Sequence, residues 1–89
     1  MPKLFYNRAA IGDVLLIVYN NDAIPNRIIK NGNVVALYND DNLVGINIFD
    51  ISKIIKIFHK GEIDDPTPAF IEIINHILIN ANLKPLEVK

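Results

Sequence analysis

The chain has no cysteine, no tryptophan, a single serine and only four glycines among its 89 residues. Without cysteine there is no disulfide framework, no thiolate nucleophile and no zinc-finger spacing, and the chain fits a reducing compartment. The glycines form neither a phosphate-binding loop nor a Rossmann fingerprint. The sole serine, Ser52, lies in no G-x-S-x-G motif. We therefore expect no cofactor and no nucleophilic catalysis.

An excess of basic charge is also missing. Nine Lys and Arg residues stand against ten Asp and Glu, a net charge of −1, whereas a domain that binds nucleic-acid phosphates over a wide face is basic. The first 32 residues carry a net +2, so the rest carry −3. The longest apolar run, Val14 to Tyr19, is far shorter than the ~20 residues that span a bilayer. With no signal-peptide pattern either, we expect a cytoplasmic protein and no membrane contact.

What the chain does contain is enough apolar surface for one core. Hydrophobic residues make up 51% and charged residues only 21%, so burial can offset conformational entropy and the chain should fold by itself. No repeat or linker divides it, and we expect one domain over residues 1–89. The chain has seventeen Ile and twelve Asn, a strongly biased composition. An Asn is therefore evidence of a structural or functional role only where its position requires one, as in a turn or a helix cap.

Three apolar segments predict strands. Leu4–Tyr6 is short, and Val14–Tyr19 is a continuous β-branched run that we expect at the centre of a sheet. In Leu43–Phe49, the side chains of Val44, Ile46 and Ile48 share one face. We interpret Gly45 as an ordinary strand glycine; the alternative is that it marks a bulge or a close backbone approach.

A hairpin is predicted around Asn31-Gly32. The apolar segments Arg27–Lys30 and Val34–Tyr38 flank this dipeptide. Because Asn and Gly both tolerate positive φ, the pair indicates a type I′ turn.

Two C-terminal helices are predicted. Asp50 is the expected N-cap of the first, whose apolar stripe is Ile51, Ile54, Ile55 and Phe58, and which ends at Gly61 after His59 and Lys60. The second is expected to begin with Thr67 as N-cap and Pro68 at its first position and to stop at Asn82 in a left-handed conformation. Its expected core residues follow the helical period: Phe70, Ile73, Ile74, Ile77, Leu78 and Ala81. Leu86–Val88 is either a last short strand or a segment leading elsewhere.

These elements predict an α+β fold, with a mostly antiparallel sheet of four or five strands and two C-terminal helices packed on one face. The two histidines, His59 and His76, lack the i, i+4 spacing of a metal pair. The carboxylate pairs Asp40-Asp41 and Asp64-Asp65 do not alternate as a calcium loop requires. We therefore expect no metal site and no enzyme.

One combination of residues favours RNA contact. Basic and aromatic side chains interleave in the first 38 residues, and such a mixture can hold phosphates and stack bases. The candidate RNA-contact residues are Arg8, Arg27, Lys30 and Tyr38. The alternative is that the strand aromatics serve packing alone.

Three segments resemble a known family. Leu4-Phe-Tyr-Asn7, Gly12-Asp-Val-Leu-Leu-Ile17 and Gly45-Ile-Asn-Ile-Phe-Asp50 occur in the same order as in the N-terminal domain of the bacterial YtpR-like tRNA-binding proteins, which are similar to the phenylalanyl-tRNA synthetase β chain. The resemblance implies a following OB-fold domain that binds tRNA, and this chain ends about where that domain would begin.

The resemblance therefore implies a non-catalytic accessory domain. Its expected role is to pack against or orient the OB-fold domain, so that tRNA is an indirect partner, or to mediate self-association as a homodimer through a sheet edge or an exposed apolar strip. The alternative is a module that contacts RNA directly through the basic and aromatic residues named above.

Overall fold

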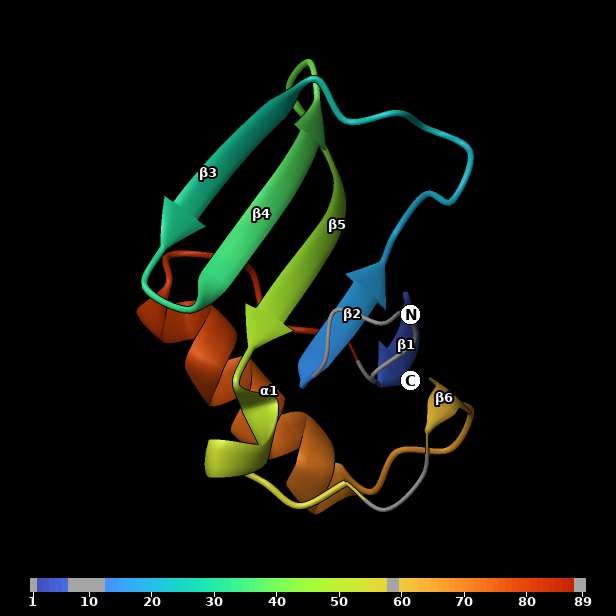
Figure 1. Cartoon of the computed structure of the whole chain (residues 1–89), viewed down its shortest axis with the longest axis vertical. Coiled ribbons are helices and arrows are strands. Elements are labelled where there is room, and N and C mark those ends of the chain that lie inside the picture. The colour runs from blue at the N-terminus through green and yellow to red at the C-terminus, as the bar shows by residue number, and fades with distance from the viewer. Residues whose placement is uncertain (1, 7–12, 58–59, 88–89) are drawn as a thin grey trace.

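A computed structural model describes residues 2–6, 13–57 and 60–87. Six strands form one sheet in the order β3-β4-β5-β2-β1-β6, and every neighbouring pair is antiparallel. One α-helix, α1 (Pro68–Asn80), packs on one face of the sheet (Figure 1). The strands are β1 (Lys3–Tyr6), β2 (Val14–Val18), β3 (Arg27–Asn31), β4 (Val34–Asn39), β5 (Asn42–Phe49) and β6 (Gly61–Ile63).

The predicted strands are confirmed, and β2 lies inside the sheet between β5 and β1. Residues directly opposite one another in a ladder share a face. The row Tyr6, Leu15, Ile48 and Val34 therefore points to the same side, which is the side of α1. The core of the domain is built there: Leu4, Leu15, Ile17, Ile46, Ile48, Ile51, Ile74 and Leu78 are all at most 1% exposed.

The predictions of two C-terminal helices and of a sheet of four or five strands are wrong, because the described residues form one α-helix and six strands. Residues Ile51–Lys53 form only a single 3₁₀ turn, η1, and Gly61–Ile63 is the sixth strand. Asp50 is not the expected N-cap, because its φ of 57° is left-handed and its side chain makes no cap hydrogen bond. An N-cap residue normally has an extended backbone. Phe58 and His59 lie outside the described residues.

The position of β6 explains why the helix is absent. β6 pairs with β1, with Tyr6 opposite Gly61, and this places it three strand positions from β5. At about 4.8 Å per strand that distance is about 14 Å. The eight residue-to-residue steps from Lys53 to Gly61 would rise only about 12 Å as a helix, whereas they reach about 26 Å when extended. A helix over this segment would therefore not reach β1, and residues 55–57, which follow the turn and are described, are accordingly not helical. Their two isoleucines have only modest helix propensity.

Both predicted ends of α1 are confirmed. Thr67 accepts a hydrogen bond from the Phe70 N–H through its hydroxyl oxygen, at 3.1 Å, and Pro68 is the first helical residue. At the other end Asn82 has a φ of 63°, and the Leu83 N–H donates to the Leu78 carbonyl at 2.9 Å, as in a Schellman motif.

The buried face of α1 is rotated relative to the predicted stripe. Ile71 is buried at 4% exposure although it was not expected in the core, whereas Ile73 and Ile77 are only partly buried. The residues that face the sheet are Phe70, Ile71, Ile74 and Leu78. The helix therefore keeps part of its predicted apolar stripe at the surface.

The hairpin between β3 and β4 is confirmed, but its turn is shifted by one residue. Asn31 pairs with Val34, so the two-residue loop is Gly32-Asn33. Gly32 has a φ of +63°, and Asn33 is not among the described residues with positive φ. Glycine with positive φ at the first loop position is typical of a type II′ turn, so the predicted type I′ turn is wrong.

A bulge lies beside Gly45. Leu37 pairs with Gly45 but Tyr38 pairs with Leu43, so Val44 is the additional residue of β5. A Cβ atom on Gly45 would lie 3.4 Å from the Ile17 carbonyl oxygen, which is close. The favoured interpretation of Gly45 as an ordinary strand glycine is therefore wrong, and the ladder supports the alternative of a bulge.

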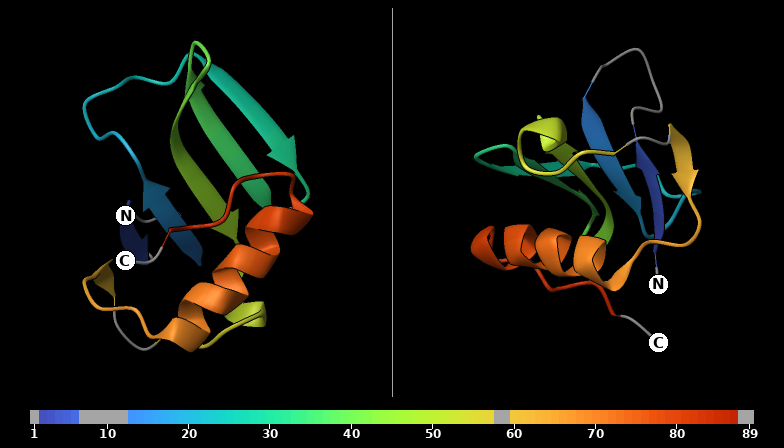
Figure 2. Two further views of the ribbon diagram at one scale, coloured as in Figure 1. Left: turned by 180° about the vertical axis from the view of Figure 1, so that it is seen from behind. Right: turned by 90° about the horizontal axis from the view of Figure 1, so that it is seen from below.

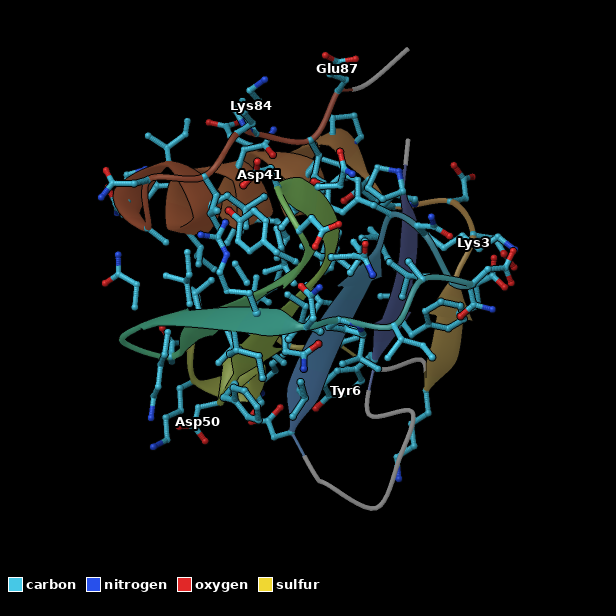
Figure 3. All side chains as sticks on the ribbon, turned by 90° about the horizontal axis from the view of Figure 1, so that it is seen from above. Lys3, Tyr6, Asp41, Asp50, Lys84 and Glu87 are labelled. Carbon is cyan, nitrogen blue, oxygen red and sulfur yellow. The ribbon has the colours of Figure 1, made fainter. Side chains whose placement is uncertain are left out.

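The segment after α1 forms no strand within the described residues. It returns on the same side of the sheet as the helix (Figure 2), and Leu86 is 4% exposed and part of the core. Lys84 and Glu87 point from this segment into solvent, on the helix side of the molecule (Figure 3).

Candidate functional site

Two of the predicted RNA-contact residues lie together at one end of the sheet. Arg27 begins β3 and is directly opposite Tyr38 in β4. The guanidinium carbon of Arg27 lies 4.8 Å from the centre of the Tyr38 ring, a cation–π contact. At an exposed site such a contact contributes about 0.5–1 kcal/mol. The guanidinium covers one face of the ring, so the pair brings a cation and an aromatic side chain together on the helix side of the sheet.

Lys30 does not join this pair. Lys30 is opposite Val35, and its position in the strand alternates with that of Arg27, so it lies on the face of the sheet away from α1. Arg8 lies outside the described residues. RNA contact by these four residues stays a prediction, and the described part of the chain does not unite Lys30 with Arg27 and Tyr38 on one face.

Asparagine side chains fix the end of the sheet that holds Arg27. The Asn26 side chain and Asp40 exchange two hydrogen bonds: the Asp40 N–H donates to Asn26 Oδ1 at 2.9 Å, and Asn26 Nδ2 donates to Asp40 Oδ1 at 3.0 Å. Asn39 Nδ2 also donates to the Ile24 carbonyl at 2.8 Å. These bonds attach the loop before β3 to the β4–β5 turn. The sequence did not predict these roles of Asn26 and Asn39, because asparagine is common throughout the chain.

The densest polar cluster of the described residues surrounds Asp13. Its carboxylate accepts a hydrogen bond from the Tyr6 hydroxyl at 2.9 Å and two contacts at 3.1 Å from the Ser52 N–H. The Ser52 hydroxyl also donates to Asp13 Oδ2. Asp13 therefore caps the 3₁₀ turn in place of Asp50, from a position immediately before β2.

The pKa shifts of Asp13 and Tyr6 indicate a structural role for this cluster. The hydrogen bond from the Ser52 hydroxyl lowers the pKa of Asp13 below its ordinary value, and this outweighs the desolvation that raises it. The hydrogen bond to Asp13 raises the pKa of Tyr6, because ionisation would remove the donated proton. An aspartate with a lowered pKa is a weaker base, so it is poorly suited to activate the Ser52 hydroxyl.

An apolar surface is left on the side of α1 that does not face the sheet. Ile54, at 47% exposure, and Ile79, at 56%, line an open hollow of about 870 Å³. Ile73 and Ile77 line it as well, with Glu72, Asn75 and His76 as polar neighbours. Burial of these isoleucine side chains against another surface would be favourable, because it removes apolar area from water.

Asn75 connects this hollow to the C-terminal segment. Its side-chain oxygen accepts the Leu86 N–H at 2.6 Å, and its Nδ2 donates to the Leu86 carbonyl at 3.3 Å. The Asn75 side chain thus bonds both the N–H and the carbonyl of Leu86, as a neighbouring strand would. It holds the end of the described chain against α1. Sequence reasoning missed Asn75, because an Asn within a helix gives no signal of a partner eleven residues later.

Two classes of site are not found within the described ranges. No group of three or more His, Cys, Asp or Glu side chains there could hold a metal ion. Neither helix that the structure describes has the length and hydropathy needed to cross a membrane.

Comparison with known proteins assigns the family. The model of a family described as a domain of unknown function, DUF4479, matches residues 21–88, from the loop before β3 through the segment after α1. No curated protein and no solved structure matches the chain. Because the matching model covers more than half of the sequence, the chain belongs to the DUF4479 family.

Proposed function

We propose that this chain is a non-catalytic accessory domain of a tRNA-binding protein, and that it packs against or orients a following OB-fold domain. The three segments that resemble the YtpR-like proteins correspond largely to β1, β2 and β5, which are neighbours in the sheet. The resemblance thus concerns the scaffold of the fold and not an exposed reactive site. This supports a structural role in preference to catalysis.

The apolar hollow on α1 is the observation that carries the proposal. Ile54 and Ile79 are each about half exposed at its surface. Leu86 is held beside it by Asn75, which itself lines the hollow. The three residues after Leu86 can reach about 11 Å at most, so a domain joined to them would begin close to this surface. Burial of the isoleucines against that domain would favour one relative orientation.

The test uses a longer protein in which an OB-fold domain follows this chain. Ile54→Glu together with Ile79→Glu should abolish the chemical-shift differences that the second domain causes along α1. Affinity for tRNA should fall by up to about tenfold, equivalent to about 1.4 kcal/mol, because the OB-fold domain is no longer oriented. Ile24→Glu is the matched control, since Ile24 is 80% exposed and lies in the loop before β3.

Two results would contradict the accessory role. One is tRNA binding by the 89-residue chain as tight as that of the longer protein. The other is an absence of any shift along α1 when the OB-fold domain is attached. Both variants should remain folded, because the substituted side chains are about half exposed or more.

A second candidate function is direct RNA contact, which the stacking of Arg27 on Tyr38 favours. Aromatic rings and guanidinium planes both stack on unpaired bases. Under this hypothesis Arg27→Glu combined with Lys30→Glu abolishes RNA binding, and binding by the parent chain weakens steeply with salt. Unchanged binding by the double variant would dismiss it.

A further inference from the structure

The outer edge of β3 is open. β3 is the first strand in the order of the sheet, and each of its five residues is exposed. Ile28 and Ile29 point to opposite faces and are 64% and 47% exposed. In the views from the front and from behind, no described element lies along this edge (Figures 1 and 2). An edge strand with apolar side chains on both faces is a template for another strand.

The hairpin determines which backbone groups point outward from β3. A two-residue loop makes Asn31 and Val34 the hydrogen-bonded pair that closes the hairpin. Hydrogen-bonded and non-hydrogen-bonded pairs alternate along an antiparallel ladder. Ile29 therefore bonds to β4, whereas Ile28 and Lys30 direct their N–H and C=O groups away from the sheet.

The spacing of these groups fits a second copy of the same edge. In a two-fold antiparallel pair of identical strands, opposite residues share a face, so the axis passes through a residue position. With the axis at Ile29, Ile28 lies opposite the partner's Lys30, and all four outward groups of each strand can bond. Arg27 then lies opposite the partner's Asn31, and no two charged side chains are directly opposed.

Other two-fold registers are less favourable. An axis at Lys30 sets the two lysines directly opposite one another, and like charges in that position are destabilising. An axis at Ile28 sets Lys30 opposite the partner's Asn26, whose N–H already donates to the Tyr38 carbonyl at 2.8 Å. The charge of Lys30 and the occupied N–H of Asn26 together favour the register centred on Ile29.

The helix side of the sheet offers room for the partner's Ile29. Ile29 borders a hollow of about 240 Å³ that is lined also by Ala36, Tyr38 and Leu83. An isoleucine that arrives from a paired strand would cover part of this apolar lining. On the opposite face, the aliphatic part of the partner's Lys30 would lie beside Ile28.

We propose that two copies of this chain associate through antiparallel pairing of their β3 strands, about a two-fold axis at Ile29, to form one continuous sheet. This pairing depends only on the β3 edge and does not require the link to tRNA. The chain itself is therefore tested, without an OB-fold domain or RNA. Failure of one proposal leaves the other intact, because the apolar hollow on α1 is a separate surface.

A single cysteine reports the register, because the natural chain has none. Residues 29 of the two copies would form a non-hydrogen-bonded pair with Cα atoms about 4.5 Å apart, within disulfide range. Ile29→Cys should therefore yield a disulfide-linked dimer under mild oxidation. Ile28→Cys alone should not, since its two copies would be about 9 Å apart, but a mixture of Ile28→Cys and Lys30→Cys should cross-link.

A second variant tests the association without a cross-link. The unmodified chain should sediment at about 20 kDa, twice its mass of 10.0 kDa, and dissociate on dilution. Ile29→Lys places like charges opposite one another and should give the monomer mass at every concentration, with an unchanged circular dichroism spectrum. Ile24→Lys should remain dimeric. A monomeric natural chain, or equal cross-linking by all three cysteine variants, would overturn the proposal.

Discussion

Asp13 and Ser52 are 39 residues apart in the sequence, and the Asp13 carboxylate accepts both the N–H and the hydroxyl of Ser52. This contact joins the start of β2 to the turn that follows β5. The Tyr6 hydroxyl donates to the same carboxylate from β1. The Asp13 side chain therefore links β1, the start of β2 and the turn that follows β5.

Removal of this carboxylate should destabilise the domain. Asp13→Asn removes the charge and replaces one acceptor oxygen by an NH₂ donor. It is expected to lower the free energy of unfolding by about 1–2 kcal/mol at neutral pH, because hydrogen bonds to a charged acceptor contribute more than those to a neutral one. The folded pKa of Asp13 is lowered from 3.8, so its contribution is complete above that pH and is lost as the pH falls through the folded value. Urea unfolding of both proteins at neutral and acidic pH measures the difference.

The control for this prediction is Asp41→Asn, in the exposed turn between β4 and β5. It should leave the free energy of unfolding within about 0.5 kcal/mol of the natural chain. A gap between Asp13→Asn and the natural chain that persisted undiminished at acidic pH would contradict the role of the charged carboxylate.

Tyr6 allows the same cluster to be tested at alkaline pH. The hydrogen bond to Asp13 raises the pKa of Tyr6 above 10.0, and burial raises the pKa of Tyr19. Because the folded Tyr6 binds its proton more tightly than the unfolded one, its contribution is complete below pH 10 and is lost as the pH rises through the folded value. In a titration of phenol absorbance, Tyr6→Phe should remove one late step, and Tyr19→Phe should leave that step in place. An unaltered number of late steps in Tyr6→Phe would be inconsistent with the hydrogen bond.

The clamp between Asn75 and Leu86 predicts a local effect. Asn75→Ala removes both hydrogen bonds to the Leu86 backbone and should cost about 1–2 kcal/mol. The amide of Leu86 should then exchange with solvent faster than the amides of β2, which report global unfolding. Asn80→Ala, at an exposed position of the same helix, serves as the control. Equal exchange of the Leu86 amide in both variants would show that the clamp has no effect.

The elements that the sequence predicted correctly depend on local signals. Alternating apolar residues specify β5, and Thr67, Pro68 and Asn82 specify the ends of α1, since each acts within one turn of the helix. The first predicted helix was wrong because distant contacts decide that segment. The Asp13 carboxylate fixes the turn, and pairing of Gly61 with Tyr6 makes Gly61–Ile63 a strand.

The candidate site was predictable only in part, for the same reason. Arg27 and Tyr38 could be identified by residue type, but their contact depends on the ladder register. The alternation of side chains along β3 also determines that Lys30 lies on the other face. Asn26 and Asn75 were missed because their partners, Asp40 and Leu86, are more than ten residues away.

The end of α1 provides a test that involves no side-chain partner. Asn82 holds a φ of 63°, which costs most L-residues about 1–2 kcal/mol and a β-branched residue at least as much. Asn82→Val should therefore lower the melting temperature by about 4–8 °C per kcal/mol lost, whereas Asn82→Gly should change it little. Asn80→Val is the matched control, because Asn80 is exposed and helical, and Val and Asn have similar helix propensities. Equal melting temperatures of the two valine variants would show that the left-handed backbone at position 82 does not destabilise a β-branched residue there.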